Sequence, residues 1–514
     1  YDGIYSSLRI LNSLDKSPWD KKLQNGIDCV ISYIRGSSWF IYKGYVPPCL
    51  SRHNFSYMSN ESRQPRTAGL AEMILNNFDK SLDKKQREEL QRFVKEAESK
   101  SIKMKTSAPG IYHGNRYFWN NDTLVRKNEE AYAIIRMASS KVNGIESFKS
   151  FNYFTCDGQT MFCRDGNEYT SIIGSWELDS VPGVTALRGL KLKAMTNWRG
   201  FNSKFAYSAG IVDGNDAACG FITDKVNRCN ECTMKFPPEL FAVTAHKSWF
   251  IFGDTLLALG AGLVNRQSQS GMDMVTTIDQ TLWKGSLSTS QDSRKPEPDS
   301  GESISLTLAK GDKPAWIKQK KGFRYNILPE YTDGKVEVRA GKRKAEWNKV
   351  YPNNKNIKNK TRECNVLQVS INHGKDSSPK SYAYTVNLGS GDNTANARKV
   401  RVITNTTELQ AAESADGLRA AGIFFSGKNI MKASSGQYSI NAPGALFVRK
   451  ENGKLHVSVC DALMNTKLDR MTFKTTCRIS GKGVSKSGDW YIATIDLPKE
   501  PYRGKYTSAT FDCK

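Results

Sequence analysis

Apolar residues recur every three or four positions along the first hundred residues, and this spacing is typical of amphipathic helices. A charged stretch at 84–100 keeps the spacing, with Leu90, Phe93 and Val94 on its apolar side. We therefore expect residues 1–100 to be helical. Two series support this expectation: Ile4, Leu8, Leu11 and Leu14, and then Leu70, Ile74, Phe78 and Leu82.

The pattern changes from Met104 onward. Short β-branched and aromatic runs then alternate with turns rich in Gly, Asn and Asp as far as Leu388, which predicts antiparallel strands. A Gly-Ser-Gly-Asp-Asn-Thr stretch at 389–394 is typical of a linker, and short strands resume over 398–514. The clearest predicted strands are 131–137, 248–252, 303–308, 336–338 and 382–386 before the linker, and 400–403, 422–425, 455–459 and 490–495 after it.

The length of the chain and the order of its elements together predict the fold class. A chain of 514 residues is too long for one hydrophobic core. Helices first and strands afterwards indicate an α+β fold. We expect three parts: a helical part at 1–100, a central antiparallel β-sandwich domain at 104–388 and a C-terminal β domain at 395–514.

The chain is strongly basic, with 75 Lys and Arg against 51 Asp and Glu and a formal net charge of +24. Such a field attracts polyanions, and an acidic polysaccharide fits it. Nucleic acid is not expected, because no reading motif is present. No run of about 18 apolar residues occurs, so no membrane span is expected either. Two basic runs, 313–324 and 339–349, are interpreted as solvated faces.

Eleven cysteines and five Asn-x-Ser/Thr sequons favour an oxidised, secreted glycoprotein. Cys229 and Cys232 form a Cys-x-x-Cys pair, which zinc or redox chemistry would also suit. No second Cys or His pair stands at ligand spacing nearby, so we predict a local disulfide. The sequons begin at Asn54, Asn60, Asn121, Asn359 and Asn405.

Four sequence blocks stand in the same order as the blocks of a known enzyme family. The first contains Glu146, Asp157-Gly158 and the turn WELDSVPGVT at 176–185. The others are GNRYFWNND at 114–122, KSWFIFGD at 247–254 with LGAG at 259–262, and TTIDQ at 276–280. Through these blocks the chain resembles polysaccharide lyase family 8, which contains chondroitin and hyaluronan lyases.

The resemblance implies both an architecture and a reaction. The architecture is the C-terminal part of an incomplete α/α toroid, then a large antiparallel β-sandwich region and a smaller C-terminal β-sandwich. The reaction is β-elimination by a secreted, extracellular lyase that cleaves chondroitin, dermatan sulfate or hyaluronan. The alternative is a catalytically inactive lyase-fold protein that only binds acidic polysaccharides.

A uronate lyase removes the proton at C5, stabilises the carbanion and protonates the leaving oxygen at C4. In the resembled family a Tyr is base and acid, an Arg held by a Glu supports it, an Asn clamps the carboxyl group and a His shares proton abstraction. The resemblance assigns catalytic roles to Tyr1, Arg52 and Glu146. This chemistry requires no cofactor, and a structural calcium site stays open because it leaves little sequence trace.

Each assignment has an alternative. Tyr1, in the context YDGIYSS, is otherwise an ordinary tyrosine. Arg52 matches the Arg-His-x-Phe of broad-specificity members, but a second alignment puts the catalytic Arg at Pro48 and leaves Arg52 a surface residue. Glu146 is otherwise a solvated acid at a turn. Three residues later Lys149 replaces the Asn of some relatives.

Two catalytic groups of the resembled family have no counterpart at the matching positions. Its Asn and His stand upstream of the Tyr, and no residue precedes Tyr1 in the sequence. We therefore expect an N-terminal partner chain, or a missing segment, to complete the toroid and supply them. His53, beside Arg52, is a weaker candidate for a replacement base.

Three tryptophans are candidates for stacking on sugar rings, because an aromatic face suits the CH surface of a pyranose. They are Trp119, Trp176 and Trp249. Each stands inside a strand-like block, so packing in the core is the favoured alternative.

Overall fold

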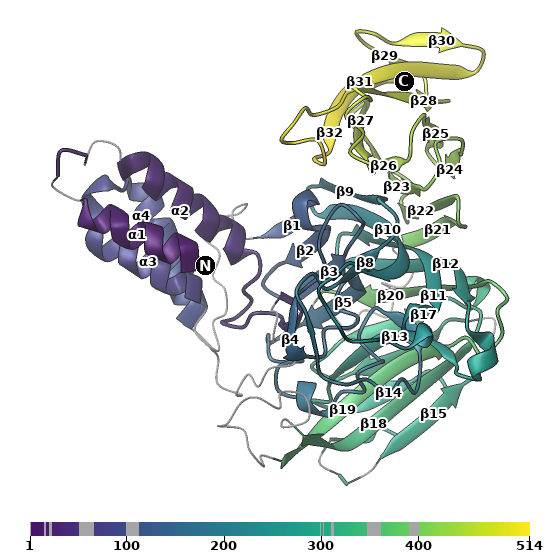
Figure 1. Ribbon diagram of the computed structural model, residues 1–514. Coiled ribbons are helices and arrows are strands. Elements are labelled where there is room, and N and C mark those ends of the chain that lie inside the picture. The colour runs from purple at the N-terminus through teal and green to yellow at the C-terminus, as the bar shows by residue number, and fades with distance from the viewer. Residues whose placement is uncertain are drawn as a thin grey trace.

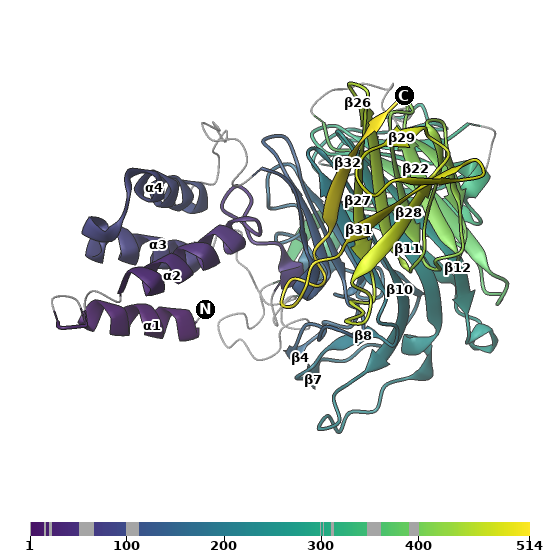
Figure 2. The ribbon, with the colours of Figure 1, turned by 90° about the horizontal axis from the view of Figure 1, so that it is seen from above.

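The computed structural model describes residues 2–14, 17–19, 23–50, 66–98, 113–298, 300–301, 303–309, 313–346, 361–389 and 400–514. The helices group on one side of the molecule and the sheets lie on the other. The C-terminal strands, drawn in yellow, lie at the top of the sheet region (Figure 1). The same division is seen from above (Figure 2). Antiparallel β-sheets dominate, as the sequence predicted for everything after the helical part.

The described residues contain four α-helices, which confirms the helical prediction. The predicted apolar series form their shared core, in which Leu8, Leu70 and Ile74 are fully buried. The helices are joined to the sheets by Lys127 of strand β2 (Thr123–Lys127), which makes a buried ion pair with Glu96. The helices are α1 (Asp2–Ser13), α2 (Leu23–Ser38), α3 (Arg66–Asn77) and α4 (Lys84–Glu98).

Four sheets are formed by residues up to 387, and the predicted linker at 389–394 lies, from 390 on, outside the described residues. The four-stranded sheet is β1 (Gly114–Phe118), β2, β3 (Tyr132–Met137) and β5 (Asp157–Cys163), and the two-stranded ribbon is β4 (Ser147–Ser150) with β7 (Met195–Asn197). The five-stranded sheet is β15 (Ile304–Leu308), β18 (Lys335–Glu346), β19 (Thr361–Asn372), β13 (Met274–Leu282) and β6 (Thr185–Leu187). The nine-stranded sheet is β14 (Leu287–Thr289), β16 (Ala315–Gln319), β17 (Arg324–Ile327), β20 (Lys380–Asn387), β12 (Thr255–Asn265), β11 (Val243–Phe252), β10 (Asp216–Asn227) and β8 (Phe201–Ser203), with β9 (Ser208–Asp213) on β10.

Two further sheets are formed by residues from 400 onward and share one core. The seven-stranded sheet is β21 (Val400–Asn405), β22 (Leu409–Ser414), β23 (Arg419–Phe424), β26 (Gly444–Glu451), β27 (Lys454–Asp461), β32 (Thr507–Cys513) and β29 (Ile479–Ser480). The five-stranded sheet is β24 (Met431–Ala433), β25 (Gly436–Ile440), β28 (Arg470–Thr475), β31 (Trp490–Asp496) and β30 (Ser485–Ser487).

The nine-stranded sheet is a middle layer, and the sequence of β11 reflects this. Successive side chains of a strand point to opposite faces of its sheet. Trp249 and Ile251 pack in the core shared with β18 and β19, whereas Phe250 and Phe252 pack against the C-terminal sheet. A strand that is buried on both faces needs a continuous apolar run. The run WFIF at 249–252 meets that need.

Every predicted strand falls on an observed one, but the observed bounds are often wider. Residues 336–338, for example, are a small part of β18. Residues 248–252 likewise belong to a longer strand, β11. The remaining parts of such strands alternate apolar with polar residues, because one face is only partly buried. A search for continuous apolar runs therefore misses them. The three domain bounds remain predictions.

The three tryptophans are packed against protein, as the favoured alternative predicted. Trp249 is fully buried, and Trp176 is 6% exposed. Trp119 is half-buried against the central core and lies 6.3 Å from Tyr502, between ring centroids. Trp176 and Trp249 are therefore core residues, and Trp119 is partly packed against the core.

Gly158 is expected to be intolerant of a side chain. Its φ is +84°, and a Cβ there would lie 2.8 Å from the Trp249 ring. An alanine there would hold a left-handed backbone and would press its Cβ against the Trp249 ring. We therefore expect Gly158→Ala to lower the free energy of unfolding by about 2 to 4 kcal/mol. Gly214 has φ +59° and open space around it, so Gly214→Ala is expected to cost only about 1 kcal/mol. Urea unfolding of both variants checks this, and equal losses would contradict the packing argument.

Asp279 of β13 is fully buried and accepts hydrogen bonds from the hydroxyl groups of Tyr169 and Tyr325. Burial raises the pKa of its carboxyl group to about 7. The folded protein therefore keeps a proton that the unfolded chain releases between about pH 4 and 7, so this group lowers stability as the pH rises through that window.

The neutral variant Asp279→Asn should lack this dependence. We expect its free energy of unfolding to rise relative to the parent by about 1 kcal/mol for each pH unit between pH 5 and 7. Urea unfolding of both proteins at several pH values measures the difference. A difference that is independent of pH would contradict the buried titration.

Candidate functional site

Glu146 lies half-buried in a loop that is held tightly to the strand β8 region. Two glycines allow this approach: a Cβ on Gly144 would collide with the backbone of Phe201, and one on Gly200 with the backbone of Ile145. The backbone carbonyl of Glu146 also accepts a hydrogen bond of 2.7 Å from the side chain of Asn152. The position of this acid is therefore set by the surrounding backbone.

The β4–β7 ribbon begins directly after Glu146 and carries two exposed aromatic rings. Phe148 and Trp198 are 36% and 43% exposed, and their rings stack with centroids 5.5 Å apart. In both views the ribbon lies on the side of the sheet region that faces the helices (Figures 1 and 2). An exposed pair of aromatic rings therefore begins two positions after Glu146 in the sequence.

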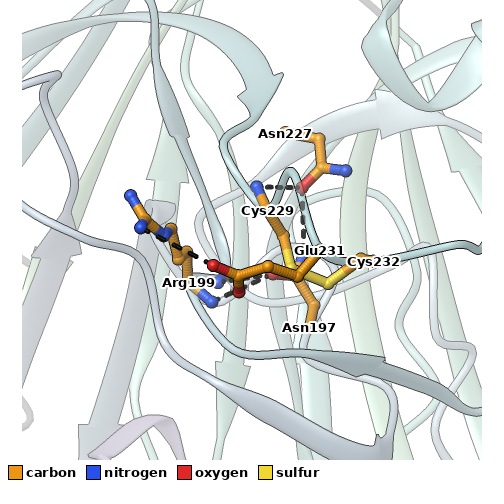
Figure 3. Close-up of a disulfide and its surroundings, with 7 residues drawn as sticks. Asn197, Arg199, Asn227, Cys229, Glu231 and Cys232 are labelled. Carbon is orange, nitrogen blue, oxygen red and sulfur yellow. Dashed lines mark hydrogen bonds and ion pairs between the residues drawn. A yellow bond between two sulfur atoms is a disulfide. The ribbon is translucent and has the colours of Figure 1, made fainter.

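A disulfide closes the loop that follows β10 and lies next to the end of the ribbon (Figure 3). Asn227 accepts hydrogen bonds from the backbone of Cys229 at 3.0 Å and from the side chain of Asn197 at 3.1 Å. Cys229 is bonded to Cys232, which confirms the predicted local disulfide. Within the described part of the chain, no group of three or more His, Cys, Asp or Glu residues could hold a metal ion.

The exposed charged residues of these segments are mainly cationic. Arg199 is 4.0 Å from Glu231 across the disulfide loop, and both side chains are more than half exposed (Figure 3). Lys149 lies beside Phe148, with its ammonium nitrogen 5.6 Å from the ring centroid. Further exposed cations in the same segments are Lys191, Lys193, Arg228 and Lys235. Such a surface suits an acidic ligand.

The structure describes one of the three predicted catalytic residues. Tyr1 and Arg52 lie outside the described residues, as does His53. Their neighbours are described: the N-terminal end of α1 is the end that lies nearest the sheet region (Figures 1 and 2). Cys49, three positions before Arg52, is fully buried in the apolar cluster that also contains Phe201. In the second alignment the catalytic position falls on Pro48, which is buried.

The Asp157-Gly158 pair of the first block has a structural role. Asp157 forms a buried ion pair with Lys225 of β10, and that ammonium also donates to the backbone carbonyl of Tyr153. Burial lowers the pKa of Lys225, while the charge of Asp157 opposes this effect. Breaking such a pair is costly because one buried charge would remain unpaired.

The TTIDQ block also holds the structure together. Gln280 accepts a hydrogen bond from the backbone of Glu177 at 2.9 Å and donates one to the carbonyl of Ser180 at 2.8 Å. Glu177 in turn makes a bidentate pair with Arg339, and these hydrogen bonds hold the pKa of Glu177 below its usual range although burial acts against them. The basic run at 339–349 is therefore partly bound into the fold and is not only a solvated face.

One large cavity among the described residues lies elsewhere. It has a volume of about 760 Å³ and opens between the β9–β10 turn and hairpins of the C-terminal sheet. Its two arginines are paired with carboxylates, Arg419 with Asp216 and Arg449 with Asp213. Glu146 does not line it. No described helix is long and apolar enough to cross a membrane.

Two domain models of one family match the chain in succession. The super-sandwich domain of polysaccharide lyase family 8 matches residues 113–399, and its C-terminal β-sandwich domain matches residues 401–470. The chain belongs to polysaccharide lyase family 8. The resemblance drawn from the four sequence blocks is thus confirmed. The two matched domains correspond to the sheets before and after residue 400.

Curated family 8 proteins are similar over part of their length. The chain is 24% identical to chondroitinase-AC of Pedobacter heparinus over 402 residues, which are 76% of this chain and 51% of that protein. It is 26% identical to a hyaluronate lyase of Thermasporomyces composti over 274 residues, which are 52% of this chain and 31% of that protein. The chain therefore spans about half the length of the first relative and about a third of the second.

Solved lyase structures resemble the whole described fold. A chondroitinase AC lyase studied as oligosaccharide complexes has a TM-score of 0.77 at 20% identity, covering 98% of this chain and 68% of that one. Xanthan lyase of Paenibacillus has a TM-score of 0.78 at 14% identity, covering 100% of this chain and 50% of that one. At these identities the likeness concerns the fold.

Sequence analysis missed the pair formed by Phe148 and Trp198. Each stands beside a basic residue in a short polar segment, Ser-Phe-Lys-Ser and Asn-Trp-Arg-Gly, which is a weak signal of an exposed aromatic residue. Their separation of fifty positions hides the stacking, because only strand pairing brings them together.

Proposed function

We propose that the protein is an extracellular glycosaminoglycan lyase. It cleaves uronic-acid-containing chains, such as chondroitin, dermatan sulfate or hyaluronan, by β-elimination to 4,5-unsaturated products. One observation carries the proposal: in a chain of the lyase family, Glu146 is fixed beside an exposed aromatic pair on a surface rich in cations. Chondroitinase-AC and a hyaluronate lyase among the relatives support this class of substrate.

Three residues of this chain take part in the proposed proton transfers. Tyr1, as phenolate, takes the C5 proton and returns a proton to the leaving oxygen at C4. Arg52 lowers the pKa of Tyr1, because a cation favours the phenolate. Glu146 holds the guanidinium in one orientation through a bidentate pair.

The described neighbours of these residues support the scheme. The N-terminal end of α1 is directed toward the sheet region, and the ribbon after Glu146 lies on the side facing the helices (Figures 1 and 2). The anchoring of Cys49 beside the Phe201 cluster fixes the backbone shortly before Arg52. In this scheme α1–α4 belong to an incomplete α/α toroid, and substrate lies between the toroid and the ribbon.

No cofactor takes part in the proposed steps, because side chains perform both proton transfers. Turnover is therefore expected to survive treatment with a chelator. If a structural calcium ion is bound, the chelator would lower the unfolding temperature without removing a catalytic group.

The test is the ultraviolet absorbance of unsaturated uronate during incubation with chondroitin sulfate and with hyaluronan. Native protein, with every polypeptide that copurifies identified by intact mass, is the sample. Rising absorbance supports the lyase. Retention of both polysaccharides without any absorbance would instead favour the alternative, a lyase-fold protein that only binds acidic polysaccharides.

A further inference from the structure

Arg116 of β1 is held by two aromatic rings from different parts of the chain. Its guanidinium carbon lies 5.7 Å from the ring centroid of Trp39, which directly follows α2, and 5.2 Å from that of Phe118. Both distances are typical of cation–π contacts. The Phe118 ring is fixed in turn by Phe40, with centroids 4.8 Å apart. The guanidinium is therefore held in place where the helical part meets the first sheet.

The donors of this guanidinium are not used within the protein. In the part of the chain that the structure describes, Arg116 makes no hydrogen bond and no ion pair, although its side chain is exposed on one side. The surrounding protein removes part of its water, and this desolvation lowers the pKa of Arg116. A cation that loses water without gaining an anion is unfavourable. An external anion would correct this.

Two other arginines that lie over aromatic rings behave differently. Arg164 and Arg324 lie 4.4 and 4.3 Å from their ring centroids. Arg164 donates to several backbone carbonyls, among them that of Gly389 at 2.9 Å. Arg324 donates to the side chain of Asn326 at 2.9 Å. Ring contact at these two sites thus accompanies occupied donors, and Arg116 departs from them.

A second polar group approaches Arg116 from the C-terminal sheets. Burial and the charge of Asp213 raise the pKa of Tyr506, whereas the charge of Arg116 lowers it, so the phenol and the guanidinium lie near each other. Asp213 is itself bound by Arg449 at 2.7 Å. The Tyr506 hydroxyl group makes no hydrogen bond with any residue in the described ranges. Two groups that can donate hydrogen bonds therefore meet without an acceptor.

The place of Arg116 fits a ligand that lies between the helices and the sheets. Strand β1 is on the side of the sheets that faces the helices (Figure 1). Trp39 and Phe118 belong to the apolar cluster that also contains Phe201, against whose backbone the loop of Glu146 is held. Arg116 therefore lies at the border of the same cluster as the proposed catalytic region.

We propose that Arg116 and Tyr506 bind the carboxylate of a uronic acid in the polysaccharide, at a subsite additional to the catalytic residues. A planar guanidinium matches a carboxylate through two parallel hydrogen bonds, and the two rings hold it in one orientation before the ligand arrives. The phenol supplies a further donor. The subsite rests on the proposed function, because it assumes that an acidic polysaccharide is the ligand.

The test compares two chains that differ in the anion they keep. Desulfated chondroitin keeps its carboxylates, and carboxyl-reduced chondroitin sulfate keeps only its sulfates. We expect Arg116→Gln to lose about ten-fold in affinity for the first chain, as for one hydrogen-bonded charged group, and less than two-fold for the second. Dissociation constants from rapid mixing, read before unsaturated-uronate absorbance rises, measure both.

Three further variants separate geometry, charge and folding. Arg116→Lys keeps the charge but not the fork, so it should remain about three-fold weaker than the native protein for desulfated chondroitin. Tyr506→Phe keeps the ring and should lose about three-fold for that chain alone. Arg478→Gln removes an exposed arginine of the C-terminal sheets and should change neither affinity. Because each variant is compared on two chains, a general loss of folding cannot imitate a selective loss.

Three outcomes would overturn the subsite. They are an unchanged affinity in Arg116→Gln, an equal loss for both chains, and a loss confined to the carboxyl-reduced chain, which would indicate a sulfate site. Failure of the proposed function looks different. A native protein that binds desulfated chondroitin through Arg116 but does not cleave it contradicts only the lyase activity, whereas one that binds neither chain overturns both proposals.

Discussion

Tyr1→Phe is expected to reduce the rate of β-elimination by about 10³-fold, because general acid–base groups contribute about 10² to 10⁴. The phenylalanine keeps the ring and loses only the hydroxyl group that exchanges protons. Polysaccharide affinity should therefore be nearly unchanged. Initial rates from unsaturated-uronate absorbance, together with dissociation constants, measure the two effects separately.

Tyr5→Phe is the matched control for this variant. Tyr5 lies in α1 four positions later, where the resembled family has a Phe, so removal of its hydroxyl group should leave turnover within about two-fold of the parent. Turnover at the parental rate in Tyr1→Phe would remove Tyr1 from the mechanism. A loss of affinity that matches the loss of rate would assign it to binding instead.

Glu146→Gln is expected to lower the rate by about 100-fold. The amide keeps the shape of the side chain but loses the charge that orients the guanidinium of Arg52, and hydrogen bonds to charged groups contribute about 1.5 to 3 kcal/mol each. Because Glu146 is half-buried in a loop fixed by Gly144 and Gly200, the neutral variant should fold normally. Rates and the unfolding temperature check both expectations.

A double-mutant cycle tests the pairing itself. If Arg52 and Glu146 act as a pair, the variant that combines Arg52→Lys with Glu146→Gln should be about as slow as the slower single variant. Additive losses would mean that the two residues act independently. Glu330→Gln, at an exposed acid on a 3-10 turn, is the control for loss of one negative charge.

The order of the sequence blocks was sufficient to identify the family, yet most of the residues in those blocks stabilise the fold. Asp157 pairs with Lys225, Gln280 ties down the turn at 176–185, and Trp249 fills the core beside Gly158. In each of these contacts the fold restricts which residue type fits the position. A fixed geometry makes a block recognisable without making it catalytic.

Local pattern determined the elements that depend on neighbours in sequence. The three- and four-residue spacing predicted the helices at 1–100, because it places one apolar face on a helix. The continuous apolar run of β11 predicted a strand, and its burial on both faces explains why that run has no polar alternation. The Cys-x-x-Cys spacing predicted the disulfide between Cys229 and Cys232, because no second Cys or His pair stands at ligand spacing nearby to complete a metal site.

Tertiary structure alone decided what depends on pairing between distant segments. Phe148 meets Trp198 only because β4 pairs with β7, and Lys149 faces solvent beside Phe148 only because the register shifts there. A one-residue change in register reverses the face of every following side chain, and no local pattern encodes it. The sequence by itself therefore determined the family, the helices, most strands and Glu146 as a candidate, whereas the exposed aromatic and cationic surface beside Glu146 was decided by packing.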